Sequence, residues 1–208
     1  MQNRRAHVTF IAVLITCAAC DDSAPVSPAV TRTARATLVS TDTPIAETGI
    51  VINEFATRNG PDEECSEFVE LRNDSSHEQS VGGWRIAVSD TTGGAVVYTI
   101  IPAGMVLQPG CHLLISTPPA GLVRDVASAC NLPDAGGLAL MRPNGTIVDQ
   151  VGMGSGSSFG EGTPLATFRG GAVRSSYARF RDDTDNNATN FVFGAATPQN
   201  RFDDCTKR

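Results

Sequence analysis

The sequence predicts an all-β fold, a β-sandwich that follows a flexible N-terminal tether. Short apolar runs are separated by turn residues about every 8–12 positions, which is typical of sandwiches built from many short strands. Glycine (20) and proline (12) are frequent, and only 18% of the 208 residues are charged. Because a helical bundle needs charged faces at helical spacing over long segments, this composition disfavours one.

The first two predicted strands, Gly49–Thr57 and Ser66–Asn73, establish the pattern. In the second strand, apolar residues such as Phe68 and Leu71 interleave with charged residues such as Glu70. Neighbouring strand residues point to opposite faces of a sheet, so this mixture indicates strands that bury one face.

The later strands follow from the same pattern and from the turns between them. Asn144-Gly145 lies between two apolar runs and is the strongest local hairpin signal in the chain. Residues 153–171 are rich in glycine and serine and predict a long loop, and residues 123–129 are compatible with a short helical turn. The further predicted strands are Gly83–Asp90, Ala95–Ile101, Cys111–Ser116, Gly137–Arg142, Thr146–Gly152, Ser175–Arg181 and Phe191–Phe193.

The N-terminus has the three parts of an export signal. Arg4 and Arg5 precede the apolar run Val8–Ile15, and Ala18-Ala19-Cys20 forms a small-residue cleavage site. The apolar run is too short to span a hydrocarbon core of about 30 Å, so we expect a cleaved signal and not a permanent helix.

Cys20 makes this segment resemble a bacterial lipoprotein signal, with residues 1–19 removed and Cys20 lipidated. The chain departs from that pattern at Cys17, which stands where leucine is usual. Two alternatives remain open: an ordinary secretory signal that happens to end in cysteine, and lipidation at Cys17 behind Thr16. Several acyl chains at about 0.8 kcal/mol per buried methylene would hold the protein at a membrane surface.

Residues 20–48 are rich in Ser, Thr, Ala and Pro and contain no aromatic residue. Such a segment cannot bury enough surface to offset its ordering entropy, so we expect a disordered tether. Loss of Arg4 and Arg5 with the signal would change the net charge from −6 to −8. An acidic chain without a basic stripe is unsuited to binding phosphate backbones, so no nucleic-acid partner is expected.

Four cysteines remain in the mature chain, and an even number in an exported protein predicts two disulfides. Three pairings are possible. We favour Cys111–Cys130, which closes the excursion after one strand, and Cys65–Cys205, which ties the C-terminal tail to an acidic loop. Zinc binding is the rival interpretation, and the absence of any CxxC pair in the sequence argues against it.

The segment Asp182–Asn187 is the best candidate metal site in the sequence. Its loop oxygens, from Asp182, Asp183, Asp185 and Asn187, are of the type that Ca²⁺ prefers. The spacing lacks the glycine and terminal glutamate of an EF-hand loop. The competing interpretation is an Asx-turn loop whose side chains cap backbone amides without any metal.

No other pattern predicts catalysis. Glu54, Glu67 and Glu70 are a candidate carboxylate set for a hydrolase, but strand residues that simply face outward are the favoured interpretation. The sequence has no GxSxG segment, and the glycine-rich stretch at 154–156 lacks the lysine of a phosphate-binding loop. We therefore predict that the protein is not an enzyme.

Eight segments of the sequence, taken in order, form a recognisable pattern. They are Ile52–Phe55, Ser66–Asn73, Gly82–Ile86, Leu107–Ile115, Gly136–Leu140, Gly145–Gly152, Ser175–Arg179 and Asp182–Asn187, followed by Phe191 and Thr197-Pro198. This pattern resembles the lamin tail domain, an immunoglobulin-like module of nuclear lamins that also occurs in secreted bacterial proteins. The resemblance implies an immunoglobulin-like β-sandwich over residues 49–202 with a C-terminal tail at 203–208, an interaction role, and no shared catalytic residue or cofactor.

Together these features predict a lipoprotein of the bacterial cell envelope, anchored at Cys20 and facing the periplasm or the exterior. Its sandwich would bind an envelope protein or a glycan through a sheet edge or the loop at 153–171. The alternatives are a Ca²⁺-dependent adhesion module and an accessory domain of a secreted hydrolase system.

Overall fold

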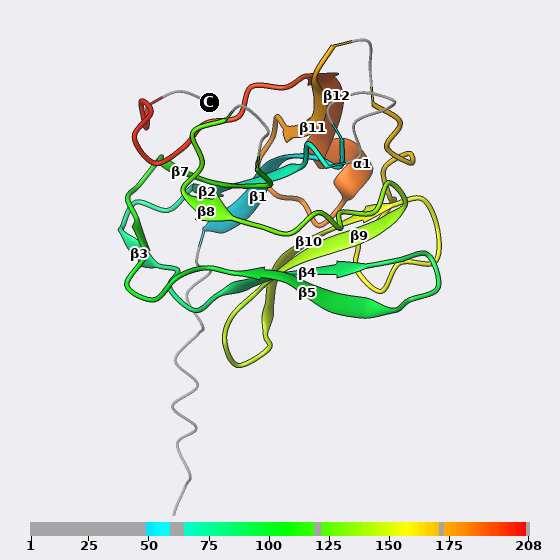
Figure 1. Cartoon of the computed structure of the whole chain (residues 1–208), viewed down its shortest axis with the longest axis horizontal. Helices are drawn as coiled ribbons and strands as arrows, with labels where there is room; N and C mark the ends of the chain where they lie inside the picture. The colour runs from blue at the N-terminus through cyan, green and yellow to red at the C-terminus, as the bar shows by residue number, and fades with distance from the viewer. Residues whose placement is uncertain (1–48, 59–64, 119–121, 171–172, 207–208) are drawn as a thin grey trace, which may run out of the picture. The chain divides into compact units, whose positions relative to one another are not determined.

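The computed structural model describes residues 49–58, 65–118, 122–170 and 173–206, all within one compact unit. These residues form a sandwich of two principal sheets (Figure 1). One sheet has six strands in the order β12-β11-β1-β2-β7-β8, and the other has four in the order β10-β9-β4-β5. The predicted all-β sandwich is confirmed.

The six-stranded sheet is built around β1 and β2, which the sequence predicts from their alternation. Its described strand pairs are antiparallel except for the short parallel pair β7 and β8. The strands are β1 (Ile50–Ala56), β2 (Phe68–Asn73), β7 (His112–Ser116), β8 (Val126–Ala127), β11 (Ser175–Arg179) and β12 (Phe191–Ala195).

The four-stranded sheet consists of two antiparallel hairpins, β4–β5 and β9–β10, joined by antiparallel pairing of β4 with β9, and a small third sheet pairs β3 with β6. Gly145 forms the predicted turn between β9 and β10 at φ 89°, a left-handed conformation that glycine adopts at little cost. The elements are β3 (Gln79–Ser80), β4 (Arg85–Ser89), β5 (Ala95–Ile100), β6 (Val106–Leu107), β9 (Gly136–Met141), β10 (Ile147–Met153) and the short helix α1 (Asn187–Asn190).

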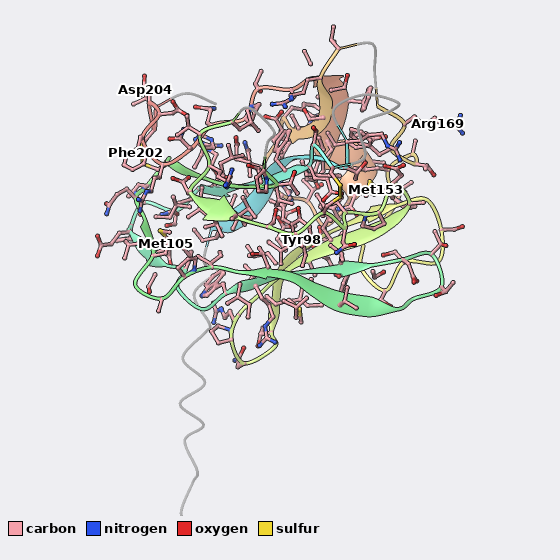
Figure 2. The ribbon with its side chains drawn as sticks, viewed as in Figure 1. Tyr98, Met105, Met153, Arg169, Phe202 and Asp204 are labelled. Carbon is pink, nitrogen blue, oxygen red and sulfur yellow. A yellow bond between two sulfur atoms is a disulfide. The ribbon has the colours of Figure 1, made fainter. Side chains whose placement is uncertain are left out.

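The core fills the space between the two principal sheets, where Figure 2 shows closely spaced side chains and Tyr98. Phe55 and Phe68 from the larger sheet and Ile86 from the smaller one are all fully buried. Trp84 joins the same cluster from the residue before β4. Burying a large apolar side chain stabilises the fold by about 1.5–3 kcal/mol, so this cluster is the main favourable contribution.

Two local elements differ from the sequence prediction. Residues 123–129 contain strand β8 and not a helical turn, because Asp125 N–H donates to Leu114 O and Ser128 N–H donates to Ser116 O along β7. Within the acidic loop, the four residues of α1 form a helical turn that the sequence analysis did not identify. Both are set by tertiary contacts, which local propensity does not report.

The four cysteines form two disulfides as predicted, but the predicted pairing is wrong. The bonds are Cys65–Cys130 and Cys111–Cys205, in place of Cys111–Cys130 and Cys65–Cys205. Glu67 explains the first, since its carboxylate accepts the N–H groups of Asn131 and Leu132 and so holds Cys130 beside Cys65. The second joins the start of β7 to the C-terminal segment.

The predicted signal peptide (1–19), the tether (20–48), Cys20 and the acidic residues 62–64 lie outside the described residues. In the part of the chain that the structure does describe, no helix has the length and apolar character needed to cross a membrane.

Peptide mapping without reduction tests the disulfide assignment. We expect digests of the exported protein to contain covalent Cys65–Cys130 and Cys111–Cys205 peptides. The Cys111→Ser/Cys205→Ser variant should lose about 2–4 kcal/mol of unfolding free energy, because its bond closes a long loop of the denatured chain. Recovery of a Cys111–Cys130 peptide from the native protein would contradict the observed pairing.

Candidate functional site

The C-terminal segment 196–206, called the strap below, lies over the outer face of the six-stranded sheet. It continues from β12 as the red trace in Figure 1 and ends near β7. Three carboxylates accept its backbone N–H groups at alternate residues. Thr197 N–H donates to Glu54 Oε1 at 2.7 Å, Gln199 N–H to Glu70 Oε2, and Arg201 N–H to Asp125 Oδ2 at 3.0 Å.

Strand register brings the first two carboxylates together. Glu54 of β1 is paired with Glu70 of β2, so both side chains leave the sheet on the face opposite the core. The sequence interpretation of outward-facing strand residues gives their direction correctly. That interpretation does not anticipate that the strap covers both side chains, which leaves only 2% of Glu54 and 0% of Glu70 exposed. Two hydroxyl groups also donate hydrogen bonds to the Glu54 carboxylate: Ser176 Oγ at 2.6 Å and Thr197 Oγ1 at 3.0 Å.

Burial dominates the electrostatics of this face. It raises the pKa of Glu70 to about 8, although hydrogen bonds from Gln199 N–H and the Asn53 amide act in the opposite direction. His112 Nε2 lies 3.7 Å from Glu70 Oε1. Burial, followed by the charge of Arg72, lowers the pKa of His112 to about 4, so this histidine is neutral at pH 7. The pair therefore carries little charge at neutral pH.

Glu67 has a different environment and does not pair with Glu70. Its carboxylate accepts hydrogen bonds from Tyr98 Oη at 3.1 Å and from the N–H groups of Asn131 and Leu132 at 3.0 and 3.1 Å. Burial raises its pKa to about 7 and also raises the pKa of Tyr98. The three glutamates singled out in the sequence thus hold backbone segments in place.

The four predicted metal ligands do not gather at one point. Asn187 is fully buried and structural: its Oδ1 accepts Gly152 N–H at 2.8 Å and Glu161 N–H at 2.9 Å, and its Nδ2 donates to Gln150 O at 3.0 Å. Asp185 adopts φ 52°, and its N–H donates to Asp183 Oδ1 at 3.3 Å. Asp182 accepts Asn190 Nδ2–H at 2.7 Å through its backbone carbonyl.

Asp183 alone among those four belongs to a cluster of carboxylates, with Asp149 and Glu161, whose oxygens lie within 4.8 Å of one another. The Arg179 guanidinium already pairs with two of these carboxylates, at 2.8 Å from Asp149 Oδ2 and 2.9 Å from Asp183 Oδ1. Burial raises the pKa of Asp149 to about 6, and burial with the neighbouring acids raises that of Glu161 to about 8. A cation would compete with this guanidinium, and Ca²⁺ binding stays a prediction.

A pocket of about 340 Å³ opens beside the strap. Its walls come from β1, β2, the end of β11 and the strap, and they include Asn53, Glu54, Arg72, Phe180, Arg181 and Gln199. Sequence analysis does not identify it, because its residues are contributed by four separate segments and match no compact motif.

Residues 43–155, just over half of the chain, match the family Lamin Tail Domain. The chain belongs to the lamin tail domain family. No curated protein sequence matches it. The match ends before β11, so the strands β11 and β12 of the six-stranded sheet lie beyond the matched region.

A pH titration of stability tests the assignment of Glu70 as a buried acid with a raised pKa. The unfolded chain loses its Glu70 proton near pH 4.5 and the folded chain near pH 8, so Glu70 lowers the free energy of unfolding as pH rises through this window. Glu70→Gln cannot titrate, and its stability curve should be flatter than that of the wild type by up to about 1 kcal/mol per pH unit.

Denaturant unfolding at several pH values between 5 and 8 measures this slope. Glu78→Gln is the matched control, because Glu78 is exposed and should leave the slope unchanged. Equal slopes for wild type and Glu70→Gln would show that Glu70 is charged throughout the window.

Proposed function

We propose that the protein is an envelope lipoprotein, anchored through Cys20, that presents its lamin tail domain as a non-enzymatic binding and structural module. The export signal, the small-residue cleavage site and the polar segment 20–48 support the anchored part of the proposal. The immunoglobulin-like family supports the binding part.

The observation that carries the binding role is the exposed apolar edge of the four-stranded sheet. Strand β5 pairs with β4 and lies at the end of the strand order. Its side chains Val96, Val97 and Ile100 are 62%, 50% and 61% exposed. A sheet edge offers unpaired backbone groups, and exposed apolar residues there mark a surface on which another chain can add a strand.

The acidic groups support a binding role over a catalytic one. Glu54, Glu67 and Glu70 each accept backbone N–H groups, and these hydrogen bonds hold the strap and the segment around Cys130. A hydrolytic carboxylate pair needs one acid free to transfer a proton to a substrate and a second free to attack or activate water. Carboxylates committed to the fold are poor candidates for either task.

Site-directed photo-cross-linking in intact cells of the source organism tests both parts of the proposal. A photoreactive residue at Val97 should give one discrete adduct with an envelope component, identified by mass spectrometry. Val123, which is 73% exposed and lies outside β5, is the matched control and should give none. Fractionation of the same cells should place the wild type with membranes and Cys20→Ser in the soluble fraction.

The two readouts fail independently. A soluble wild-type protein would contradict anchoring at Cys20, and the absence of any adduct specific to Val97 would contradict binding through β5.

A further inference from the structure

The pocket beside the strap is lined mainly by charged and polar residues, unlike the apolar edge at β5. Its volume of about 340 Å³ falls within the range of small-molecule sites, about 300–1,000 Å³. Its walls are held in place by the fold: β1, β2 and β11 are strands inside the six-stranded sheet, and the strap is fixed by its carboxylate contacts and by Cys111–Cys205. A preformed polar hollow of this size does not need to be created by its ligand.

Three buried polar atoms of pocket-lining residues have no hydrogen-bond partner among the described residues. They are two donors, Arg72 Nε and Arg179 Nη1, and one acceptor, Gln199 Oε1. Arg179 Nη1 lies 2.9 Å from Asp183 Oδ1 in an ion pair, so Arg72 Nε and Gln199 Oε1 are the two that a ligand would satisfy. The Arg72 side chain is held by its Nη1, which lies 2.8 Å from Asp74 Oδ1. Burying a polar group without a partner costs about 1–3 kcal/mol, which a ligand can recover.

The charges of the lining indicate the kind of ligand. Arg72, Arg179 and Arg181 contribute three guanidinium groups, and they are matched by the carboxylates of Glu54, Asp74 and Asp182. A balanced lining has no excess field for an ion of either sign. It does present donors and acceptors side by side, and a hydroxyl group satisfies both because it donates one hydrogen bond and accepts others.

Phe180 adds an apolar surface at the pocket. Its side chain is 52% exposed although it lies among charged groups, and the Arg181 guanidinium lies 4.9 Å from its ring centroid. Aromatic rings present a flat apolar face beside polar groups and suit ligands with one apolar and one polar side. The C–H face of a sugar ring has this character.

We propose that this pocket binds a neutral, hydroxyl-rich ligand, namely a sugar unit of a glycan. Ligand hydroxyls pair with Gln199 and Arg72, and the ring packs on Phe180. This second binding surface is independent of partner binding at β5 and of lipid anchoring.

An array of defined neutral oligosaccharides, with acidic oligosaccharides and peptides as comparators, tests the proposal on the full chain carrying Cys20→Ser. Gln199→Leu and Phe180→Ala probe the pocket, and neither removes the backbone bonds of these residues to Glu70 and Asn190. The matched controls are Gln108→Leu and Phe202→Ala. Gln108 bonds to Glu78 on the surface, and Phe202, labelled in Figure 2, is 76% exposed beside Arg201.

We expect at least one neutral oligosaccharide to bind, with affinity reduced tenfold or more by each pocket variant and less than twofold by each control. Melting curves verify that all four variants are folded. Binding of acidic oligosaccharides or peptides alone would overturn the assignment of a neutral sugar. Binding that is insensitive to both pocket variants, or no binding to the array, would overturn the proposed site.

Discussion

The contact between buried carboxylates and the backbone of the strap determines the outer face of this protein. The strap follows β12 and has no strand partner of its own for the N–H groups at 197, 199 and 201, so these groups need acceptors under cover. Glu54, Glu70 and Asp125 supply them.

This arrangement links the fold to the candidate sites. Thr197 and Gln199 form part of the pocket wall because their N–H groups are held by Glu54 and Glu70. The same cover removes Glu70 from water and raises its pKa to about 8. The disulfide at Cys205 fixes the far end of the strap, where Gly110 takes φ 74° directly against the Cys205 carbonyl and leaves no room for a larger residue.

The sequence predicts the parts of this structure that follow from local patterns. Alternation locates β1 and β2, and Asn144-Gly145 locates the β9–β10 hairpin. Cysteine pairing could not be deduced in the same way, because separation along the chain does not determine which cysteines meet in the fold. The covering of the outer face by the strap could not be predicted either, because alternating acids have the same sequence pattern whether they face solvent or a covering segment. An acid directly opposite another acid, as Glu54 is to Glu70, becomes visible only with the strand register.

Native-state hydrogen exchange, followed residue by residue by NMR, tests the role of the carboxylates most directly. We predict that the amides of Thr197 and Gln199, whose bonds to Glu54 and Glu70 are partly buried, exchange far more slowly than that of Asn200, whose N–H bonds to Asp203 on the exposed surface. Glu54→Ala should release Thr197 first. Uniformly fast exchange along residues 196–206 in the wild type would contradict this role, because the carboxylate contacts would then open too readily to hold the strap in place.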